Sequence, residues 1–372
     1  MHLTAPFARA SLSRRGFLAS GSLALLGMAA SSAEIGDEPL DRMPDGSQAR
    51  DMITPAAQRC IDRGLEFLSR CQHRDGSFGE RQYMGNVAVT ALAGLAFMAG
   101  GHQPGRGLYG KSVTEALQSV LSKEDRRKAG YFHHPNAANH GPMYEHGFGA
   151  LFLAEVHGMV GNKELRQELR QKLKRSIELI VASQNSEGGW RYTPEARDAD
   201  ISVTICQIMA LRAARNAGIY VPKSCVDKCT AYVKACQDHT GGFRYMKQGS
   251  PPGFARTAAG IVALYSAGIY KGPEIERGLR YLMQNKPGQA FPRHGMHEAH
   301  FFYGHYYAAQ AMWAAGGDYW KEWFPAIRDE LIARAGSRQD GGWSDMFCSH
   351  YGTAMALIIL QIPNNYLPIL QR

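Results

Sequence analysis

Arg63 to Phe78 reads RGLEFLSRCQHRDGSF, and this stretch decides the fold because versions of it recur along the chain. It passes from an amphipathic segment to a glutamine, and then to a glycine turn that carries an aromatic residue. Such a repeat predicts that one supersecondary unit is copied and stacked. Six copies occur, and their turn aromatics follow at intervals of 48 to 58 residues: Phe78, Phe132, Trp190, Phe243, Phe291 and Trp343.

Each copy predicts two helices of different character. The first, as in residues 55–71, has apolar residues on one side and charged residues elsewhere, which is typical of a helix that covers a core. The second, as in residues 87–98, is apolar all round and must be buried. Six such hairpins should close into an all-α (α/α)6 barrel, one domain over residues 51–372. The copies are Pro55 to Gly101, Ser112 to Gly161, Glu164 to Gly218, Pro222 to Tyr270, Gly272 to Gly317 and Tyr319 to Pro363.

The connectivity of the repeat predicts where a site would lie. Every outer helix leads into its inner helix through the glycine turn, so all six inner helices should begin at one end, the mouth of the barrel. The N–H groups and dipoles of helix N-termini favour negative charge. We therefore expect that an anionic group could bind at the mouth.

The N-terminus predicts export. Residues 1–33 contain Arg14 and Arg15 ahead of a mildly apolar run that ends in small residues, which resembles a twin-arginine signal. The run is too short, and too rich in Gly and Ser, for a membrane span. Residues 34–50, rich in Pro, Gly and acidic residues, should form a flexible linker. The barrel is therefore expected in the periplasm or another extracytoplasmic space.

The composition and net charge indicate which classes of binding partner to expect. The chain has 372 residues, of which 45% are hydrophobic, and a formal net charge of +9. These values are ordinary for a globular protein, and the positive charge favours an anionic partner such as a membrane surface, a diphosphate or an acidic polymer. Lys and Arg are scattered along amphipathic helices, so nucleic acid is not expected. The seven cysteines have no paired metal-ligand spacing and should mostly be buried packing residues; the sequence leaves the oligomeric state open.

The repeat resembles the QW repeats of squalene-hopene and oxidosqualene cyclases, and the related repeats of protein prenyltransferase β subunits. The match is carried by Arg63, Phe67, Gln72, Gly76 and Phe78, and the resemblance extends over about residues 55–363. It implies an α/α toroid in which the glutamine ties the outer helix to the turn and the turn aromatic packs between units. It also implies an isoprenoid-like or other apolar ligand in a central cavity.

Asp198-Ala199-Asp200-Ile201-Ser202 resembles the DxDD motif of class II terpene cyclases, whose middle aspartate protonates an alkene or epoxide. The resemblance places Asp200 at that position, with Asp198 beside it. Ile201 departs from the motif, and those cyclases pair two barrels where this chain has one. The alternative is that one of these polar residues caps a helix.

A zinc site is a further candidate. Asp345, Cys348 and His350 precede an inner helix, and protein prenyltransferases hold zinc with an Asp, a Cys and a His at the barrel mouth. The spacing differs from that family, in which the His comes from a following unit. His305 could take its place. Zinc therefore stands as a cofactor to be tested.

Residues that depart from the repeat are the remaining candidates, because whatever every copy carries is structural. Histidines gather in the second and fifth copies, which should face each other across the mouth and form a pocket of acid/base groups among aromatic residues. The alternative is that these histidines are solvated loop residues, which we prefer for His133, His134 and His294. The candidates for catalysis are Asp200, Asp198, His305 and Tyr303, and those for substrate binding are Tyr144, Glu145, His146, Arg256, Phe302 and Tyr351.

Three functions remain open. The first is an exported cyclase-like or prenyltransferase-like barrel that binds or transforms an isoprenoid or other apolar ligand. The second is a polysaccharide lyase or hydrolase, since a basic α/α barrel suits polyuronates. The third is a binding or scaffold protein that has kept the barrel and lost the chemistry.

Overall fold

The computed structural model describes residues 49, 51–136, 141–195, 197–288, 300–335 and 339–371. The export signal predicted for residues 1–33 lies outside them, as does the predicted linker except for Ala49. The described segments form helices, turns and a few isolated bridges, without a β-strand. None of the described helices is both long and apolar enough to cross a bilayer.

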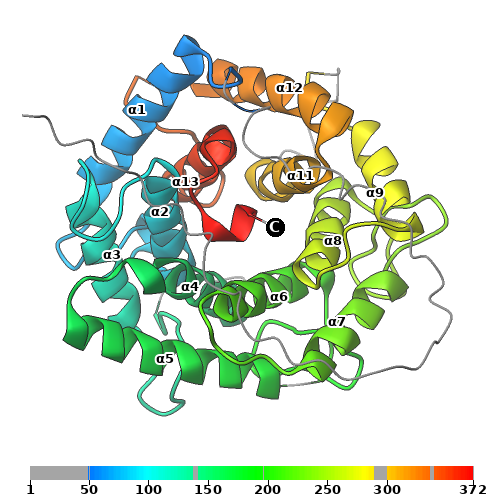
Figure 1. The fold of residues 1–372 in the computed structure, drawn as a ribbon, viewed down its shortest axis with the longest axis horizontal. Coiled ribbons are helices and arrows are strands. Elements are labelled where there is room, and N and C mark those ends of the chain that lie inside the picture. The colour runs from blue at the N-terminus through cyan, green and yellow to red at the C-terminus, as the bar shows by residue number, and fades with distance from the viewer. Residues whose placement is uncertain are drawn as a thin grey trace, which may run out of the picture. The chain divides into compact units, whose positions relative to one another are not determined.

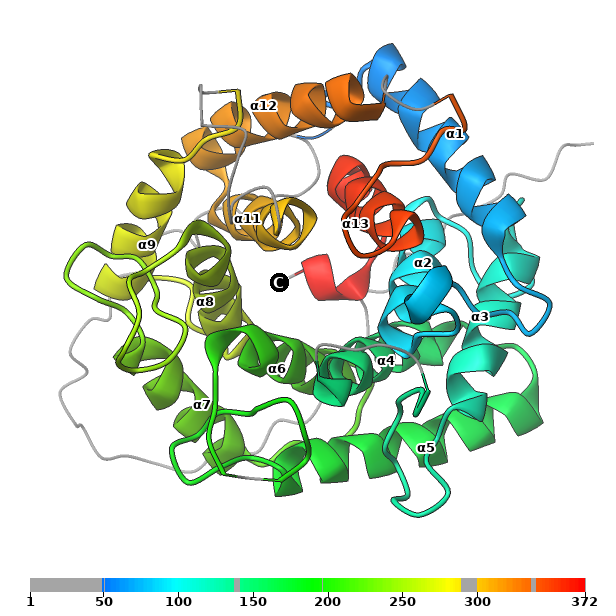
Figure 2. The ribbon, with the colours of Figure 1, turned by 180° about the vertical axis from the view of Figure 1, so that it is seen from behind.

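Over these residues the chain forms an outer ring of helices around an inner ring (Figures 1 and 2). The predicted all-α toroid of helical hairpins is therefore confirmed. The outer helices are α1 (Pro55–Cys71), α3 (Gly110–Ser122), α5 (Lys163–Ala182), α7 (Lys223–Ala235), α9 (Pro273–Met283) and α12 (Gly317–Ala335). The inner helices are α2 (Val87–Ala99), α4 (Pro142–Val156), α6 (Ile201–Asn216), α8 (Phe254–Ser266), α11 (Phe301–Ala315) and α13 (Ser349–Gln361). Short 3-10 turns are η2 (Arg81–Tyr83), η3 (His157–Met159), η4 (Ile362–Asn364) and η5 (Pro368–Leu370).

The two rings differ in burial as their sequences predict. In α2 every residue except Ala88 is buried, whereas α1 buries one face. Small residues let the inner helices approach closely, because a Cβ placed on Gly94 would lie 2.6 Å from the ring of Phe152 on α4. The cysteine trio of α7 and its C-cap, Cys225, Cys229 and Cys236, is buried as expected.

In four copies one threonine of the inner helix fixes the turn before it. In the first copy the hydroxyl Oγ1 of Thr90 accepts the N–H of the turn aromatic Phe78 at 3.0 Å. The same contact recurs between Thr204 and Trp190, Thr257 and Phe243, and Thr353 and Trp343. We call this repeated position the turn-acceptor position. In these four copies it joins the inner helix to the turn before it.

The repeated glutamine joins three segments. The Gln72 side-chain amide donates to the carbonyl oxygens of Gly76 and Ser112, each at 3.0 Å. Gly76 belongs to the turn, and Ser112 to the next outer helix. Gln184 and Gln237 make the corresponding pairs of bonds. The expected tie between the outer helix and its turn is therefore confirmed, and each tie also reaches the following copy.

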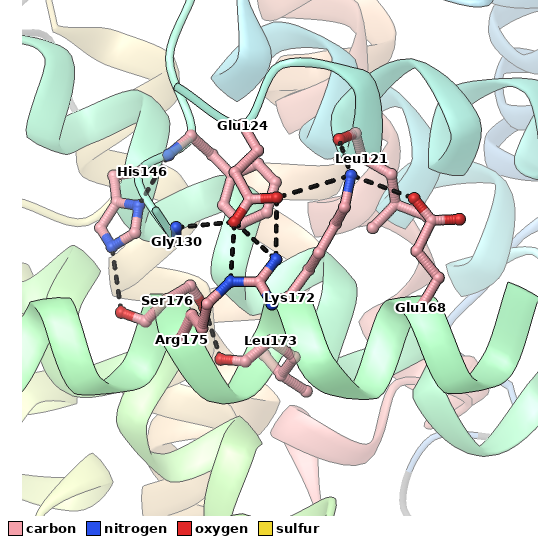
Figure 3. Close-up of polar contacts among 10 residues, drawn as sticks. Leu121, Glu124, Gly130, His146, Glu168, Lys172, Leu173, Arg175 and Ser176 are labelled. Atoms are coloured by element: carbon pink, nitrogen blue, oxygen red, sulfur yellow. Dashed lines mark hydrogen bonds and ion pairs between the residues drawn. The ribbon is translucent and has the colours of Figure 1, made fainter. Parts of the chain in front are cut away.

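The second copy uses charge in place of this amide (Figure 3). Glu124 Oε1 accepts the N–H of Gly130 at 2.7 Å and lies 3.0 Å and 2.8 Å from Nε and Nη2 of Arg175 on α5. Lys172 adds a second cation, 3.6 Å from the other carboxylate oxygen. These contacts hold the pKa of Glu124 below its usual value, against the effect of burial. The ion pairs thus tie α5 to the preceding turn.

The ring closes between the last copy and the first. A Cβ on Gly64 of α1 would meet the indole of Trp343 at 2.8 Å, so the last turn packs directly on the first outer helix. In the inner ring, the Gln361 amide donates to the carbonyl of Ala96 at 3.0 Å. These contacts exclude an open stack of hairpins.

The C-terminal tail, residues 366–371, runs inward and ends near the centre of the ring (Figure 1). Trp313 Nε1 donates to the carbonyl of Leu370 at 3.1 Å, and the N–H of Ile369 donates to Glu155 Oε2 at 2.9 Å. Trp313 and Glu155 belong to the last turns of their inner helices, so the tail covers the end opposite the mouth. The cavity left beside it measures about 20 Å³, which holds about one water.

Candidate functional site at the mouth of the barrel

The inner helices begin at the same end of the barrel. The hydroxyl of Tyr303, at the start of α11, donates to the carbonyl of Ser202, at the start of α6, at 3.1 Å. The N–H of Val87, at the start of α2, donates to Glu145 in the first turn of α4. The predicted mouth is thereby formed by residues that are far apart in the sequence.

Several helix N-termini at the mouth are already occupied by carboxylates of the chain itself. Glu145 Oε2 accepts the first N–H of α2 at 2.8 Å, and Glu80 Oε1 accepts the first N–H of α13 at 2.6 Å. Asp200 accepts the second and third N–H groups of α6, those of Ser202 and Val203. Because these dipoles are satisfied internally, the reason for expecting an external anion does not hold for α2, α6 and α13.

Asp200 is a helix cap and also one half of an ion pair. It is fully buried, and its Oδ1 accepts the N–H groups of Ser202 and Val203 at 2.8 Å and 2.9 Å. Its Oδ2 lies 2.9 Å from Nη1 of Arg191. Burial raises the pKa of Asp200, while the Val203 N–H and Arg191 oppose the rise. The capping alternative is therefore confirmed for this residue.

Arg191 organises one wall of the mouth. Besides Asp200, its guanidinium lies 3.2 Å from half-exposed Asp198 and donates to the Tyr245 hydroxyl at 2.8 Å. It also lies over the ring of Tyr192, 4.4 Å from the centroid. One cation thus faces two carboxylates, which leaves this wall negative. Three residues of this wall were not predicted from the sequence, although each closely follows a turn aromatic: Arg191, Tyr192 and Tyr245.

Three tyrosines predicted for the site are brought together. Tyr144, Tyr303 and Tyr351 are partly exposed at the starts of α4, α11 and α13. Burial raises the pKa of each phenol well above its usual value; Tyr303 adds to the rise at Tyr144, and Tyr351 to that at Tyr303. Below them, the Tyr307 hydroxyl lies 3.4 Å from the sulfur of Cys206. The mouth cluster is defined as Tyr144, Arg191, Tyr192, Asp200, Tyr245, Tyr303 and Tyr351.

Glu145 and His146, predicted to bind substrate, belong to the scaffold instead. Glu145 is buried against α2, where it also accepts the N–H of His134 at 3.1 Å. His146 fills the turn-acceptor position of its copy, since its Nδ1 accepts the N–H of Phe132 at 3.2 Å. Burial lowers the pKa of this fully buried imidazole to about 3. A neutral His146 therefore does the work of the threonine in other copies.

His305 and Phe302 also lie in packed surroundings. The His305 ring is buried, 4.4 Å from the ring of Phe301, 4.9 Å from that of Phe254 and 6.0 Å from that of Trp323 on the outer helix α12. Phe302 is buried against Gly352 of α13. These positions correct the expectation that both residues line the mouth. The turn of this copy, with Phe291, lies outside the described residues.

The predicted zinc ligands do not form a site. His350 Nδ1 accepts the N–H of Gly79 at 3.0 Å, and its ring packs edge-on against Phe67 and Phe78. No three His, Cys, Asp or Glu side chains of the described residues come close enough to hold a metal ion. The prediction that Asp345, Cys348 and His350 form a zinc site is therefore corrected. The residue types suit zinc, but the fold does not bring the three side chains together.

The remaining candidates lie at the edge of the site. Arg256 Nη1 lies 3.2 Å from both Ser250 Oγ and the carbonyl of Pro251, so it fixes the loop before α8. His133 is a loop residue, as predicted, but its Nε2 pairs with Asp125 at 2.9 Å. His294 lies outside the described residues.

This chain belongs to the family of the prenyltransferase alpha-alpha toroid domain, whose model matches residues 48–226 and 110–297. Its curated relatives include two drimenyl diphosphate synthases. The protein from Streptantibioticus cattleyicolor is 33% identical over 85 residues, which are 23% of this chain and 15% of that protein. The protein from Streptomyces showdoensis is 28% identical over 185 residues, 48% of this chain and 31% of that protein. The chain thus spans less than a third of either relative.

Solved structures share the barrel at low identity. A type II terpene cyclase variant from Scytonema, in complex with geranylgeranyl dihydroxybenzoate, is 14% identical with a TM-score of 0.55, over 84% of this chain and 98% of that one. An alpha-1,6-mannanase from Salegentibacter sp. HEL1_6 is 7% identical with a TM-score of 0.58, over 83% and 99%. Cellobiose 2-epimerase from Bacillus thermoamylovorans is 12% identical with a TM-score of 0.57, over 83% and 99%. These identities show the fold alone.

Proposed function

We propose that the chain, exported by its twin-arginine signal, binds an isoprenoid-like apolar ligand at the mouth cluster and promotes carbocation chemistry on it. One observation carries this proposal: the aromatic rings of the mouth cluster lie around a single cation, Arg191, which faces the two carboxylates of Asp200 and neighbouring Asp198. Aromatic faces attract a cation, and fixed negative charge stabilises one as it forms. An anionic ligand would instead meet Asp198 and Asp200 beside Arg191.

The comparisons support an isoprenoid ligand. Two relatives are named drimenyl diphosphate synthases, and the Scytonema structure is that of a type II terpene cyclase. The single barrel of this chain covers 98% of that cyclase. One barrel therefore accounts for nearly the whole of a type II terpene cyclase structure.

Within this proposal Asp200 is the fixed anion of the cluster. Its two oxygens accept three hydrogen bonds, two from N–H groups and one from Arg191. A carboxyl held in this way stays in place as a ligand binds, and its charge faces the tyrosines. Such preorganised charge is the form in which electrostatic stabilisation acts in a site with little water.

The test is a binding experiment with two unlike probes. Native mass spectrometry of the purified full chain should show a one-to-one complex with geranylgeraniol and none with alpha-1,6-mannotetraose. Tyr303→Ala and Tyr351→Ala should each weaken geranylgeraniol binding by at least tenfold. Tyr220→Ala, whose side chain is 82% exposed on the outer surface, should bind as the wild type does. Binding of the sugar alone, or geranylgeraniol binding that ignores both mouth tyrosines, would contradict the proposal.

A further inference from the structure

Two carboxyls stand at opposite sides of the mouth. Asp200 precedes α6 in the third copy, and Asp345 precedes α13 in the sixth. Helices α6 and α13 are three places apart in the inner ring and face each other across it (Figure 1). The two carboxyls are far apart in the sequence, so their opposition appears only once the ring is closed.

The mouth tyrosines bridge the distance between the two carboxyls. Besides burial, the charge of Asp345 raises the pKa of Tyr351, and Tyr351 in turn acts on Tyr303. On the other side, Tyr303 and Asp200 both act on Tyr144. The geometry agrees: the Tyr303 hydroxyl donates to the carbonyl of Ser202, two residues after Asp200, and the Tyr351 ring lies 6.4 Å from that of Phe347, two residues after Asp345. The phenols therefore lie between the two carboxyls. A flexible apolar chain lying along these phenols would meet Asp345 at one end and Asp200 at the other.

The surroundings of the two carboxyls differ. Asp200 is fully buried and paired with Arg191, as described above. Asp345 is partly exposed, and its Oδ1 accepts the N–H of Phe347 at 2.8 Å. Its charge raises the pKa of Tyr83 and Tyr351, and the backbone of Cys348 also hydrogen-bonds to it. Among the described residues, no Lys, Arg or His side chain forms an ion pair with it. Burial raises the pKa of Asp345 to about 6, so about half of it carries a proton at pH 6 and roughly a tenth at pH 7.

We propose that Asp345 is the proton donor of the mouth and that Asp200 is its ion-paired counterpart, held by Arg191. This inference rests on the proposed isoprenoid function. Two carboxyls in unlike surroundings commonly divide acid and anion roles in this way. Asp345 offers a partly exposed carboxyl beside aromatic rings, whereas the oxygens of Asp200 are committed to Arg191 and to the start of α6.

The proposed reaction is an isomerisation of the ligand. The O–H bond of Asp345 breaks, and its proton forms a C–H bond with one carbon of a ligand double bond, which leaves a tertiary carbocation on the other carbon. A second double bond of the ligand supplies the electron pair that closes a ring. The final cation loses a proton to water, and Asp345 regains one from solvent. The product has the formula of the ligand, and no oxidant or other co-reactant is needed.

Deuterium labelling tests this assignment. The full chain is incubated with geranylgeraniol in D2O, and the products are analysed by gas chromatography and mass spectrometry. The expected product is a cyclic isomer that carries one carbon-bound deuterium. Asp345→Asn should lower its rate of formation by at least a hundredfold, the scale of general acid catalysis, and leave binding within threefold. Asp345→Glu should retain part of the rate, and Asp227→Asn, on outer helix α7, should match the wild type.

The outcomes separate this inference from the function on which it rests. A wild-type chain that does not bind geranylgeraniol overturns both. A chain that binds it and forms no deuterated cyclic product keeps the binding function and overturns the proton transfer. Asp345→Asn turnover at the wild-type rate overturns the role of Asp345, and loss of turnover in Asp200→Asn alone would return that role to Asp200.

Discussion

The imidazole Nε2 of His146 donates to the carbonyl oxygen of Ser176 at 3.2 Å and so joins inner helix α4 to outer helix α5 (Figure 3). Its other nitrogen accepts the N–H of Phe132, which makes His146 a bridge between a turn and two helices. A threonine at this position is too short to make both contacts. The second copy therefore gains a tie that the threonine copies lack.

His146→Ala should lower the free energy of unfolding by about 2–3 kcal/mol, because it leaves two buried backbone groups without partners. Its folded-state pKa of about 3 lies below the ordinary 6.5, so the unfolded chain takes up the proton first as the pH falls. The stabilisation is full above pH 6.5 and declines toward pH 3. Urea unfolding across this range should show the wild type approaching the variant in acid. An equal loss in His133→Ala, on the neighbouring loop, would count against the bridge.

Gly188→Ala and Gly218→Ala separate backbone strain from collision. Gly188 has φ of +100°, and an added Cβ would lie 2.2 Å from the carbonyl oxygen of Lys228. Gly218 has φ of +77° with nothing within 4 Å. The Gly218 variant should lose about 1 kcal/mol from strain, and the Gly188 variant at least twice that, because α7 must shift. Thermal unfolding of both variants measures the difference, and equal losses would show that the turn is not pressed against α7.

Glu155→Gln should remove a pH dependence from the far end of the barrel. Burial raises the pKa of Glu155 to about 7 from its ordinary 4.5, although the Ile369 N–H and Arg212 oppose the rise. As the pH rises above 4.5, the unfolded chain loses this proton first, so stability falls until about pH 7. Glutamine can accept the same N–H without a charge. The variant should match the wild type at pH 4.5 and exceed it by about 2–3 kcal/mol at pH 8 in urea unfolding. Exposed Glu178→Gln is the control, and an unchanged profile in Glu155→Gln would refute the explanation.

Asp200→Ala should be far more damaging than Asp198→Ala. The first change removes a cap from α6 and leaves Arg191 without its buried partner, which typically costs about 3 kcal/mol. Asp198 is half-exposed and holds the same guanidinium from outside, so its loss should cost less than about 1 kcal/mol. Chemical unfolding of the two variants gives the comparison. If Asp200→Ala were as stable as the wild type, Asp200 would have no capping role.

The fold could be predicted because the repeat carries its own contacts. The bonds of Gln72 to Gly76 and of Thr90 to Phe78 recur in other copies, so periodicity alone indicated hairpins, turns and a closed ring. The mouth tyrosines Tyr144, Tyr303 and Tyr351 followed from the same logic, because inner helices that start together bring their first residues together.

The rest of the site could not be predicted from departures from the repeat. His146 differs from threonine in type but makes the same bond to its turn, and His350 bonds to Gly79 of another copy. A departure from the repeat can therefore preserve a structural role through different chemistry. Arg191 was missed for the opposite reason: it lies in a loop between helices, where the position of a side chain depends on partners such as Asp200 and Tyr245.

The inward turn of residues 366–371 makes the ring a cup with one opening, where a tunnel would have two. A ligand bound as proposed would enter and leave at the mouth, so one molecule would have to leave before the next could bind. Ligand exchange would then be controlled at the mouth, whereas lengthening or tethering residues 366–371 would disturb the opposite end of the barrel, far from the mouth cluster.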